Sequence, residues 1–546
     1  MKIKRKISFI LVLILYGLFS TSCSKNEPLE TNYNIEMEFD SSLNRFNCLM
    51  NVDWVNNSET SISEIPFHFL IDSTNSQLQS VKLNDQKCEF QYVTKDTHKF
   101  EGFIINPVKA IKPGQKVRIE LDFNTINEEN LRDNKTSLFF SEHIPDLQYF
   151  ENGQFNPYYQ NSENYHVTIV VPADYKVATS GIIVKEEIIN GNKHLTTKVN
   201  QIPYYGVVLF EDIVVKELIT INDILIRSFY FNEDSLWGNR LLEYADNVIR
   251  FYKDTIGFYP GKTLTIVPGY PKPYGGWPIC PNVVGVHRGI DQKGDGAETH
   301  AEWITAHEIG HQYWGFNYIL EPLDYPQWLG ISMGIYTDRL YARKYNVAKK
   351  YNHFMYYYRW GVRQGYNTTI MQTVDTLNKQ NFDWNNVIKH GKSFAVLDLL
   401  EDEIGENNFN KVFVHILNNY QGINVTLDMF KKACEEKSNQ DLDWFFDQWY
   451  YTNDSLGYQV TDAKLVQQSD SIQTECTILK TGNAIASNVE IGFQFENGEM
   501  IIKTINGKDS STKLSILTKQ EIKKIIIDPH EKLPVVNKKN HEFSKD

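Results

Sequence analysis

ETHAEWITAHEIGHQYWG, residues 298–315, has a helical pattern and carries two histidines four positions apart. On a helix this spacing places His307 and His311 on one face, where both imidazoles can bind one metal ion. Glu308 then lies beside the ion, so it can accept a proton from metal-bound water and pass it to a leaving amine. Gly315 is expected to end the helix. The competing interpretation is a pair of surface histidines on an amphipathic helix, and the aromatic residues around the motif disfavour it.

The regions on either side of this helix differ in pattern. From residue 36 to about 218 the chain has short alternating runs such as KVRIELDF and YHVTIVVP, which are typical of antiparallel β-structure. Long helical patterns follow, and alternating strands return after Gly457. The sequence therefore predicts a multidomain α+β fold. The expected segments are a signal peptide (1–23), a tether (24–34), an N-terminal β domain (35–218), an α-rich domain (219–457) and a small C-terminal β domain (458–546).

The N-terminus has the features of an export signal. Four basic residues between positions 2 and 6 precede an apolar run, residues 7–19, that is too short for a permanent membrane helix. The small residues STS then lead to Cys23, which resembles the lipidation site of a bacterial lipoprotein. A plain secretory signal with a chance cysteine is the alternative. We expect a location in the bacterial cell envelope, with a lipid anchor at Cys23, on either the periplasmic or the outer-membrane face.

Composition narrows the classes of partner. The net charge is −13 and no basic patch is present, so nucleic acid is not an expected partner. After Cys23 five scattered cysteines remain without any CxxC pair, which argues against a thiolate metal site or a redox motif.

Several motifs together resemble the aminopeptidase N family of zinc metallopeptidases. HEIGHQYWG is similar to the family's HExxHQWxG, YGGWP lies where the family has its GxMEN substrate loop, and PQWLG lies where it has WLNEG. HGKSFAVLDLLEDEIGE resembles the segment that begins with the family's catalytic tyrosine, and WFFDQWYY resembles the end of its catalytic domain. The resemblance covers about residues 140–455. It implies a β-sandwich-like N-terminal domain, a thermolysin-like catalytic domain, a small C-terminal β-sandwich, Zn²⁺ as cofactor and a peptide or protein substrate.

The third zinc ligand of the family, the glutamate of WLNEG, has no counterpart in this chain. Aligning on Trp328 places Ile331 at the ligand position, whereas counting from His311 places Gly330 there. Neither residue can bind zinc. Glu321, Asp324 and Asp338 lie nearby in the sequence, but we do not expect any of them to replace the ligand in place.

Two further positions depart from the family pattern. Gly275, Gly276 and Trp277 are expected to contact substrate, but Pro278 stands where the family has the glutamate that binds a free amino terminus. His390 aligns with the oxyanion-binding tyrosine and can donate a hydrogen bond in its place. A two-residue shift would put Ile388 there instead, and a purely structural role for His390 stays open.

These departures leave two classes of function. The first is a zinc-dependent metallopeptidase with altered recognition of the amino terminus, in which Glu308 and His390 are catalytic and His307 and His311 bind the metal. The second is a catalytically inactive peptide- or protein-binding lipoprotein that keeps the peptidase fold. Retention of both histidines and Glu308 favours the first class, whereas loss of the ligand, the amine anchor and the tyrosine favours the second.

Overall fold

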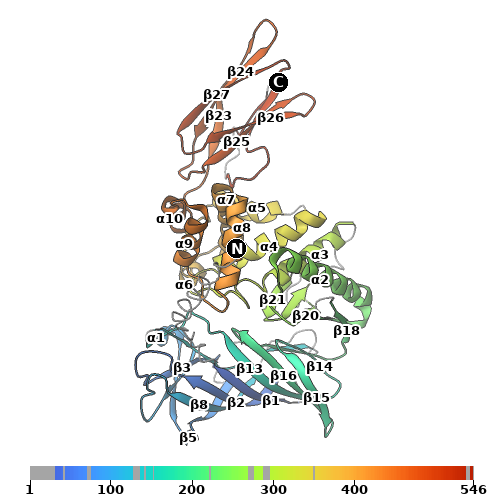
Figure 1. Cartoon of the computed structure of the whole chain (residues 1–546), viewed down its shortest axis with the longest axis vertical. Coiled ribbons are helices and arrows are strands. Elements are labelled where there is room, and N and C mark those ends of the chain that lie inside the picture. The colour runs from blue at the N-terminus through green and yellow to red at the C-terminus, as the bar shows by residue number, and fades with distance from the viewer. Residues whose placement is uncertain are drawn as a thin grey trace, which may run out of the picture.

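The computed structural model arranges the chain as a β-rich region, a helical region and a second β-rich region along its long axis (Figure 1). This order confirms the predicted multidomain α+β fold. The residues that the structure describes are 31–40, 44–70, 76–126, 136–139, 143–151, 153–220, 223–268, 276–286, 295–347, 351–535 and 541–544. Cys23 and Gly275 lie outside them.

The N-terminal region is built from sheets that share one apolar core. The alternating run 116–123 forms part of β8, whose side chains alternate between exposed and buried as the pattern predicted. Ring packing joins the two larger sheets, because Phe69 lies 5.3 Å from Phe123 between ring centroids. The strands of the largest sheet, in spatial order, are β15 (Ile182–Ile189), β16 (Asn192–Ile202), β13 (Glu163–Pro172), β1 (Asn32–Phe39), β2 (Arg45–Val55), β8 (Lys116–Ile126), β4 (Ser76–Leu83) and β5 (Gln86–Lys87).

All neighbours in the largest sheet are antiparallel except β1 and β13, which run parallel.

Smaller sheets and a short helix complete this region. The remaining elements are the sheet β10 (Asp146–Leu147), β3 (Ile65–His68), β7 (Gly102–Asn106) and β6 (Glu89–Val93), the sheet β14 (Lys176–Thr179), β17 (Val207–Phe210) and β9 (Thr136–Phe139), the pair β11 (Tyr149–Glu151) and β12 (Gln154–Asn156), and helix α1 (Lys95–His98).

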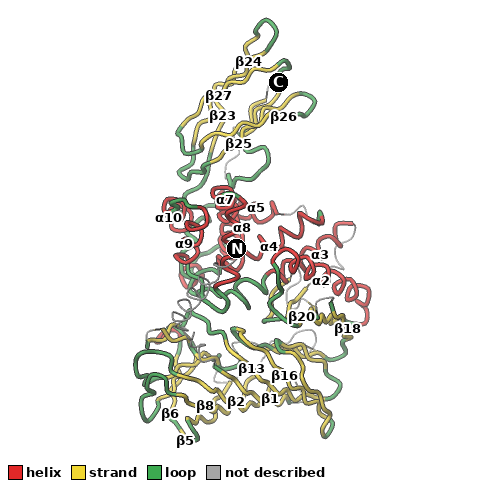
Figure 2. Tube along the Cα trace, in the orientation of Figure 1, coloured by secondary structure: helices red, strands yellow, loops and turns green. Residues whose placement is uncertain are grey.

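A five-stranded sheet introduces the helical region (Figure 2). Its strands, in spatial order, are β18 (Val214–Ile219), β19 (Leu225–Tyr230), β20 (Thr263–Pro268), β22 (Val283–Val286) and β21 (Gly276–Cys280). The expected domain boundary at residue 218 falls inside β18, which pairs with β19 along its whole length. Among the described residues β21 pairs with β22 alone, so it lies at the edge of this sheet.

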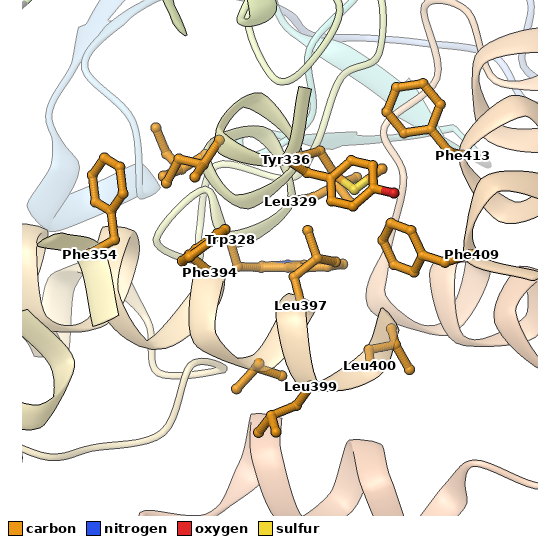
Figure 3. Close-up of a cluster of buried hydrophobic side chains, with 14 of the residues drawn as sticks. Trp328, Leu329, Tyr336, Phe354, Phe394, Leu397, Leu399, Leu400, Phe409 and Phe413 are labelled. Atoms are coloured by element: carbon orange, nitrogen blue, oxygen red, sulfur yellow. The ribbon is translucent and has the colours of Figure 1, made fainter. Parts of the chain in front are cut away.

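Eleven helical segments follow or interrupt these strands within the described residues. They are the 3₁₀ turn η1 (Asn232–Asp234), α2 (Ser235–Ile256), α3 (Asp295–Gly310), α4 (Trp328–Tyr345), α5 (Tyr351–Arg363), α6 (Val374–Asn378), the π-helical segment η2 (Asn385–Lys392), α7 (Ser393–Ile404), α8 (Glu406–Asn419) and α9 (Leu427–Ser438), and α10 (Asp443–Tyr451) closes the region. Aromatic and leucine side chains from α4, α7 and α8 form its core, with Tyr336 packed on Phe409 and Phe413 (Figure 3). This core fixes α4 in place beside α3.

The C-terminal region consists of two sheets that continue the same apolar cluster. Its strands are β23 (Tyr458–Gln467), β24 (Ile472–Lys480) and β27 (Ser511–Thr518) in one sheet, and β26 (Met500–Asn506), β25 (Asn488–Phe495), β28 (Ile522–Ile527) and β29 (Glu542–Ser544) in the other. The buried guanidinium of Arg359 on α5 donates to the carbonyl oxygens of Glu531 and Leu533, so the loop after β28 is docked on the helical region.

The described residues hold five cysteines, all of them buried and none in a disulfide. Among the same residues, no helix combines the length and the apolar character that a membrane crossing requires.

Candidate metal centre

Helix α3 ends earlier than the sequence predicted. The α-helix stops at Gly310, because the N–H of Gln312 bonds to the carbonyl three residues back instead of four. Gly315 follows in a turn and takes a left-handed φ of +80°, which glycine adopts without strain. The N–H of His311 still bonds to the carbonyl of His307 at 3.2 Å, so the two histidines keep their helical spacing.

The two imidazoles meet inside the protein. Nε2 of His307 lies 3.2 Å from Nε2 of His311, and the two residues are only 7% and 1% exposed. Two nitrogens bound to one tetrahedral zinc ion at their usual bond lengths would lie about 3.3 Å apart. The interpretation as a pair of surface histidines is therefore wrong, and the spacing fits two ligands of a single metal ion.

Asp338 of α4 fixes the orientation of the first imidazole. Its Oδ2 lies 2.6 Å from Nδ1 of His307, and its Oδ1 accepts a hydrogen bond from Nε1 of Trp303 at 3.0 Å. A carboxylate accepts hydrogen bonds, so Nδ1 of His307 carries the proton and Nε2 presents its lone pair to the site. Burial lowers the pKa of His307, but the hydrogen bond that it donates to Asp338 and the charges of Glu308 and Asp338 outweigh this effect, and the net shift is upward.

The second imidazole is held in its neutral form. Burial lowers the pKa of His311 well below the usual range, and the charges of His307, His390 and Lys389 lower it further. Neutral imidazole is the form that binds metal ions. Gly334 of α4 lies against this ring, because a Cβ placed there would come within 2.5 Å of Cε1 of His311.

Glu308 lies beneath the edge strand β21. The residue is 2% exposed, and a Cβ built on Gly276 would come within 2.5 Å of Cγ and 2.7 Å of Oε1 of Glu308. The strand can therefore approach the carboxylate this closely only with glycine at position 276. This contact brings one predicted substrate residue, Gly276, to α3.

Trp277, the other predicted substrate residue that the structure describes, is not brought to Glu308. The indole of Trp277 packs over Gly285 of β22, where a Cβ would come within 2.8 Å of Nε1. Because successive side chains of a strand alternate between faces, Trp277 faces away from the side where Gly276 meets Glu308. Pro278 is the next residue of β21, and this strand carries no acidic side chain.

A side chain at position 330 would point to Glu321 and Gly315, although the backbone of Gly330 hydrogen-bonds His311. The N–H of Gly330 donates to Oε1 of Glu321 at 2.8 Å, and the N–H of Leu329 donates to Oε2 at 3.0 Å. Glu321 is thus an acceptor for the first turn of α4, in agreement with the expectation that it does not replace the ligand. Among the described residues, the only three-membered group of potential metal ligands lies elsewhere, at Glu435, Asp441 and Asp443.

His390 lies in the π-helical segment η2, near the second histidine. Its Nδ1 is 2.7 Å from the carbonyl oxygen of Asn385, so this nitrogen donates its hydrogen to the backbone. Phe354 of α5 stacks with both His390 and His307, with ring centroids 6.0 and 6.2 Å away and interplanar angles of 11° and 21°. A π-helical segment is an uncommon backbone form that is frequent at functional sites.

The residues present supply part of a zinc site. His307 and His311 fit two positions in spacing, burial and protonation, whereas a catalytic zinc site normally has three protein ligands. The described part of α4 offers Gly330 or Ile331 where the third would stand. The donor set is therefore one ligand short.

Comparison with protein families agrees with this geometry. The model of the peptidase family M1 domain matches residues 290–449, from the start of α3 to the last turn of α10. This matched segment supports membership of the M1 aminopeptidase N family of zinc metallopeptidases. Members of this family are generally zinc-dependent. No curated protein matches the chain.

The M1 domain contains positioning residues that the sequence did not reveal as such. Asp338 was considered only as a replacement ligand, although its side chain lies behind His307. Gln312, which follows the second histidine, accepts a hydrogen bond from the N–H of Asn282 at 2.7 Å, and Asn282 donates to the carbonyl of Ser180 at 2.8 Å. The spacing between Asp338 and the WLG motif was visible in the sequence, but the partners of Gln312 depend on the tertiary fold.

Proposed function

We propose that this M1 family member is a zinc-dependent metallopeptidase with a thermolysin-like catalytic domain and altered recognition of the amino terminus. The observation that carries the proposal is the pair of Nε2 atoms 3.2 Å apart, with Nδ1 of His307 bound to Asp338. A buried carboxylate behind a histidine is the usual support of a metal-binding imidazole. A protein that binds no metal would gain little stability from burying the carboxylate of Asp338 behind His307.

Each residue has a distinct role in this proposal. His307 and His311 hold the metal, which when bound supplies a Lewis acid for the scissile carbonyl. Glu308 acts as the general base and then as the proton donor to the leaving amine. His390 is proposed to donate a hydrogen bond to the oxyanion.

The edge strand β21 is the proposed binding strand for an extended peptide. The side of β21 opposite β22, which faces no other strand of the described residues, can add a substrate strand through backbone hydrogen bonds. Gly276 places this strand against Glu308. Because β21 carries no carboxylate for an ammonium group, peptides with an acetylated amino terminus should be cleaved about as well as free ones. A strong preference for free amino termini would contradict this part of the proposal.

A catalytically inactive peptide- or protein-binding lipoprotein is the second candidate. The observation that favours it is the absence of a third ligand from the described part of α4. Such a protein would bind peptides on β21 without cleaving them.

A Glu308→Gln variant separates the two candidates. We expect the parent protein to contain zinc and to cleave members of a broad peptide library, and the variant to keep its zinc but lose turnover. Glu436→Gln, an exposed glutamate of α9, is the matched control and should behave like the parent. Equal cleavage by the parent and Glu308→Gln would exclude Glu308 as the base, and binding without cleavage would establish the second candidate.

We also propose that the protein is exported and anchored by lipid at Cys23 in the bacterial cell envelope. The basic and apolar pattern before Cys23 supports this location.

A further inference from the structure

The face of α4 that turns toward the histidines can be followed from Asp338. Its carboxylate binds His307, so this side of the helix faces α3. Residues seven apart on an α-helix differ by only about 20° in direction. Ile331 lies seven residues before Asp338 and therefore on the same face.

Gly334 lies between these two positions and confirms the direction of the face. A Cβ at Gly334 would come within 2.5 Å of Cε1 and 2.6 Å of Nδ1 of His311. Moving along α4 from Asp338 toward its N-terminus thus leads from the first imidazole to the second. Ile331, one turn further, is buried at 4% exposure.

Gly330 belongs to a different face of the helix. A Cβ there would meet Oε1 of Glu321 at 2.5 Å and Cα of Gly315 at 2.8 Å. Thr337, seven residues later, accepts a hydrogen bond from Nε1 of Trp314 at 3.0 Å. At both positions the side-chain direction points to the segment after α3, and only the backbone of Gly330 reaches an imidazole, that of His311.

The remaining side of α4 is committed to the core. Tyr336 packs on Phe409 and Phe413, with centroid distances of 4.7 and 5.8 Å (Figure 3). Leu329, seven residues earlier, lies on the same side and is 1% exposed. The three faces of the helix are therefore distinct in what they contact.

We propose that Ile331, and not Gly330, occupies the position of the missing third metal ligand, and that α4 leaves this coordination position unfilled. The inference rests on the proposed function only in its choice of zinc as the ion. An isoleucine side chain has no donor atom, so the two histidines alone hold the ion and bind it weakly. A carboxylate introduced at position 331 should complete the site, whereas one at position 330 should not.

Zinc affinity, measured by competition with a chromophoric chelator, tests this assignment in the full-length protein. We expect Ile331→Glu to bind zinc more tightly than the parent. The gain in affinity should exceed the roughly 10–100-fold that an outer-shell partner contributes to metal affinity. Ile331→Gln, with similar size but no charge, is the matched control and should show no such gain. Gly330→Glu should show no gain and should melt at a lower temperature, because its side chain would meet Glu321 and Gly315.

Three results would overturn the inference: a gain in Gly330→Glu, unchanged zinc affinity in a folded Ile331→Glu, or a parent that already binds as tightly as Ile331→Glu. Circular dichroism reports whether each variant folds, and Ile331→Asp provides a shorter carboxylate if the glutamate does not fit. Peptide cleavage is a separate readout. A gain in zinc affinity without any cleavage would uphold the assignment of Ile331 and contradict the proposed function.

Discussion

Asp338 determines which nitrogen of His307 is available to a metal ion. With one oxygen on Nδ1 of the imidazole and the other on the indole of Trp303, the carboxylate cannot rotate without losing a hydrogen bond. The proton on His307 is therefore held on the side away from the site. Both Asp338 and His307 are buried, so water cannot readily replace either partner.

Replacing Asp338 with asparagine should weaken zinc binding. The amide can still accept a hydrogen bond through its oxygen, but it lacks the charge that makes His307 a better ligand. We expect zinc affinity to fall by about 10–100-fold, measured by chelator competition. Asp470→Asn, at an exposed position of the C-terminal region, should leave the affinity unchanged. An equal affinity in both variants would show that Asp338 does not support the metal site.

His390 should matter for turnover more than for binding. If its ring donates to the oxyanion, His390→Ala should lower kcat by about two to three orders of magnitude, with little change in KM or zinc content. His390→Tyr should recover activity. His415→Ala, a half-buried histidine of α8, serves as the control. Parent-like kinetics in both His390 variants would leave the residue with a structural role, which its bond to Asn385 could provide.

Helix α4 begins on a buried carboxylate. Glu321 accepts from the N–H groups of Leu329 and Gly330, so it satisfies two donors that the first turn of a helix leaves without partners. Burial nevertheless raises the pKa of Glu321 from 4.5 to about 7, and the two hydrogen bonds and Lys389 offset this only in part. The start of α4 is thus sensitive to pH.

Glu321 should make the folded protein less stable as pH rises from 4.5 to 7. In the unfolded chain the carboxyl ionises near 4.5, whereas in the folded protein it keeps its proton up to about 7. Each increase in pH within this window therefore lowers the free energy of unfolding, by at most about 3 kcal/mol in total. Comparing melting temperatures at pH 5 and pH 8, we expect a larger decrease in the parent than in Glu321→Gln. The control Glu436→Gln should show the parent's pH dependence, and identical dependence in all three proteins would contradict the assignment.

Sequence patterns predicted the long elements well and the short strands of the helical region poorly. Helix α2 and strand β8 fill their patterns because each presents a regular apolar face. Strands β21 and β22 were not predicted, since they are short and separated by a proline-containing turn. The position of the third ligand could not be chosen between Gly330 and Ile331 from the sequence alone. The glutamate that would align the WLNEG motif is itself replaced in this chain.

The three regions of the molecule are joined by polar contacts at buried positions. Asn282 connects the catalytic helix with Ser180 of the N-terminal region, and Arg359 connects α5 with the loop that ends at Leu533. Ser180 and Leu533 accept through their backbone carbonyl oxygens, whereas Gln312 accepts through its side-chain amide oxygen. The relative placement of the regions therefore depends on main-chain geometry as well as on side-chain packing.

Replacing Cys23 with serine should release the protein from the membrane fraction. Lipoprotein processing attaches more than one acyl chain, which gives stable anchoring where a single chain does not. Fractionation followed by immunoblotting is the measurement, and Cys48→Ser is a control that leaves the proposed lipidation site intact. Retention of the Cys23→Ser protein with the membranes would show that the lipid anchor was wrongly assigned.

The docking of Arg359 bears on how the catalytic part could be produced as a separate fragment. The residues that match the M1 domain end at 449, but a fragment cut there would lose the Glu531 and Leu533 carbonyls that accept from this guanidinium. The same helix carries Phe354, which stacks on His307 and His390. A shortened product would thus expose a buried cation at one end of α5 and loosen an aromatic contact of the metal centre at the other. For recombinant work, the smallest useful piece extends at least to Val535.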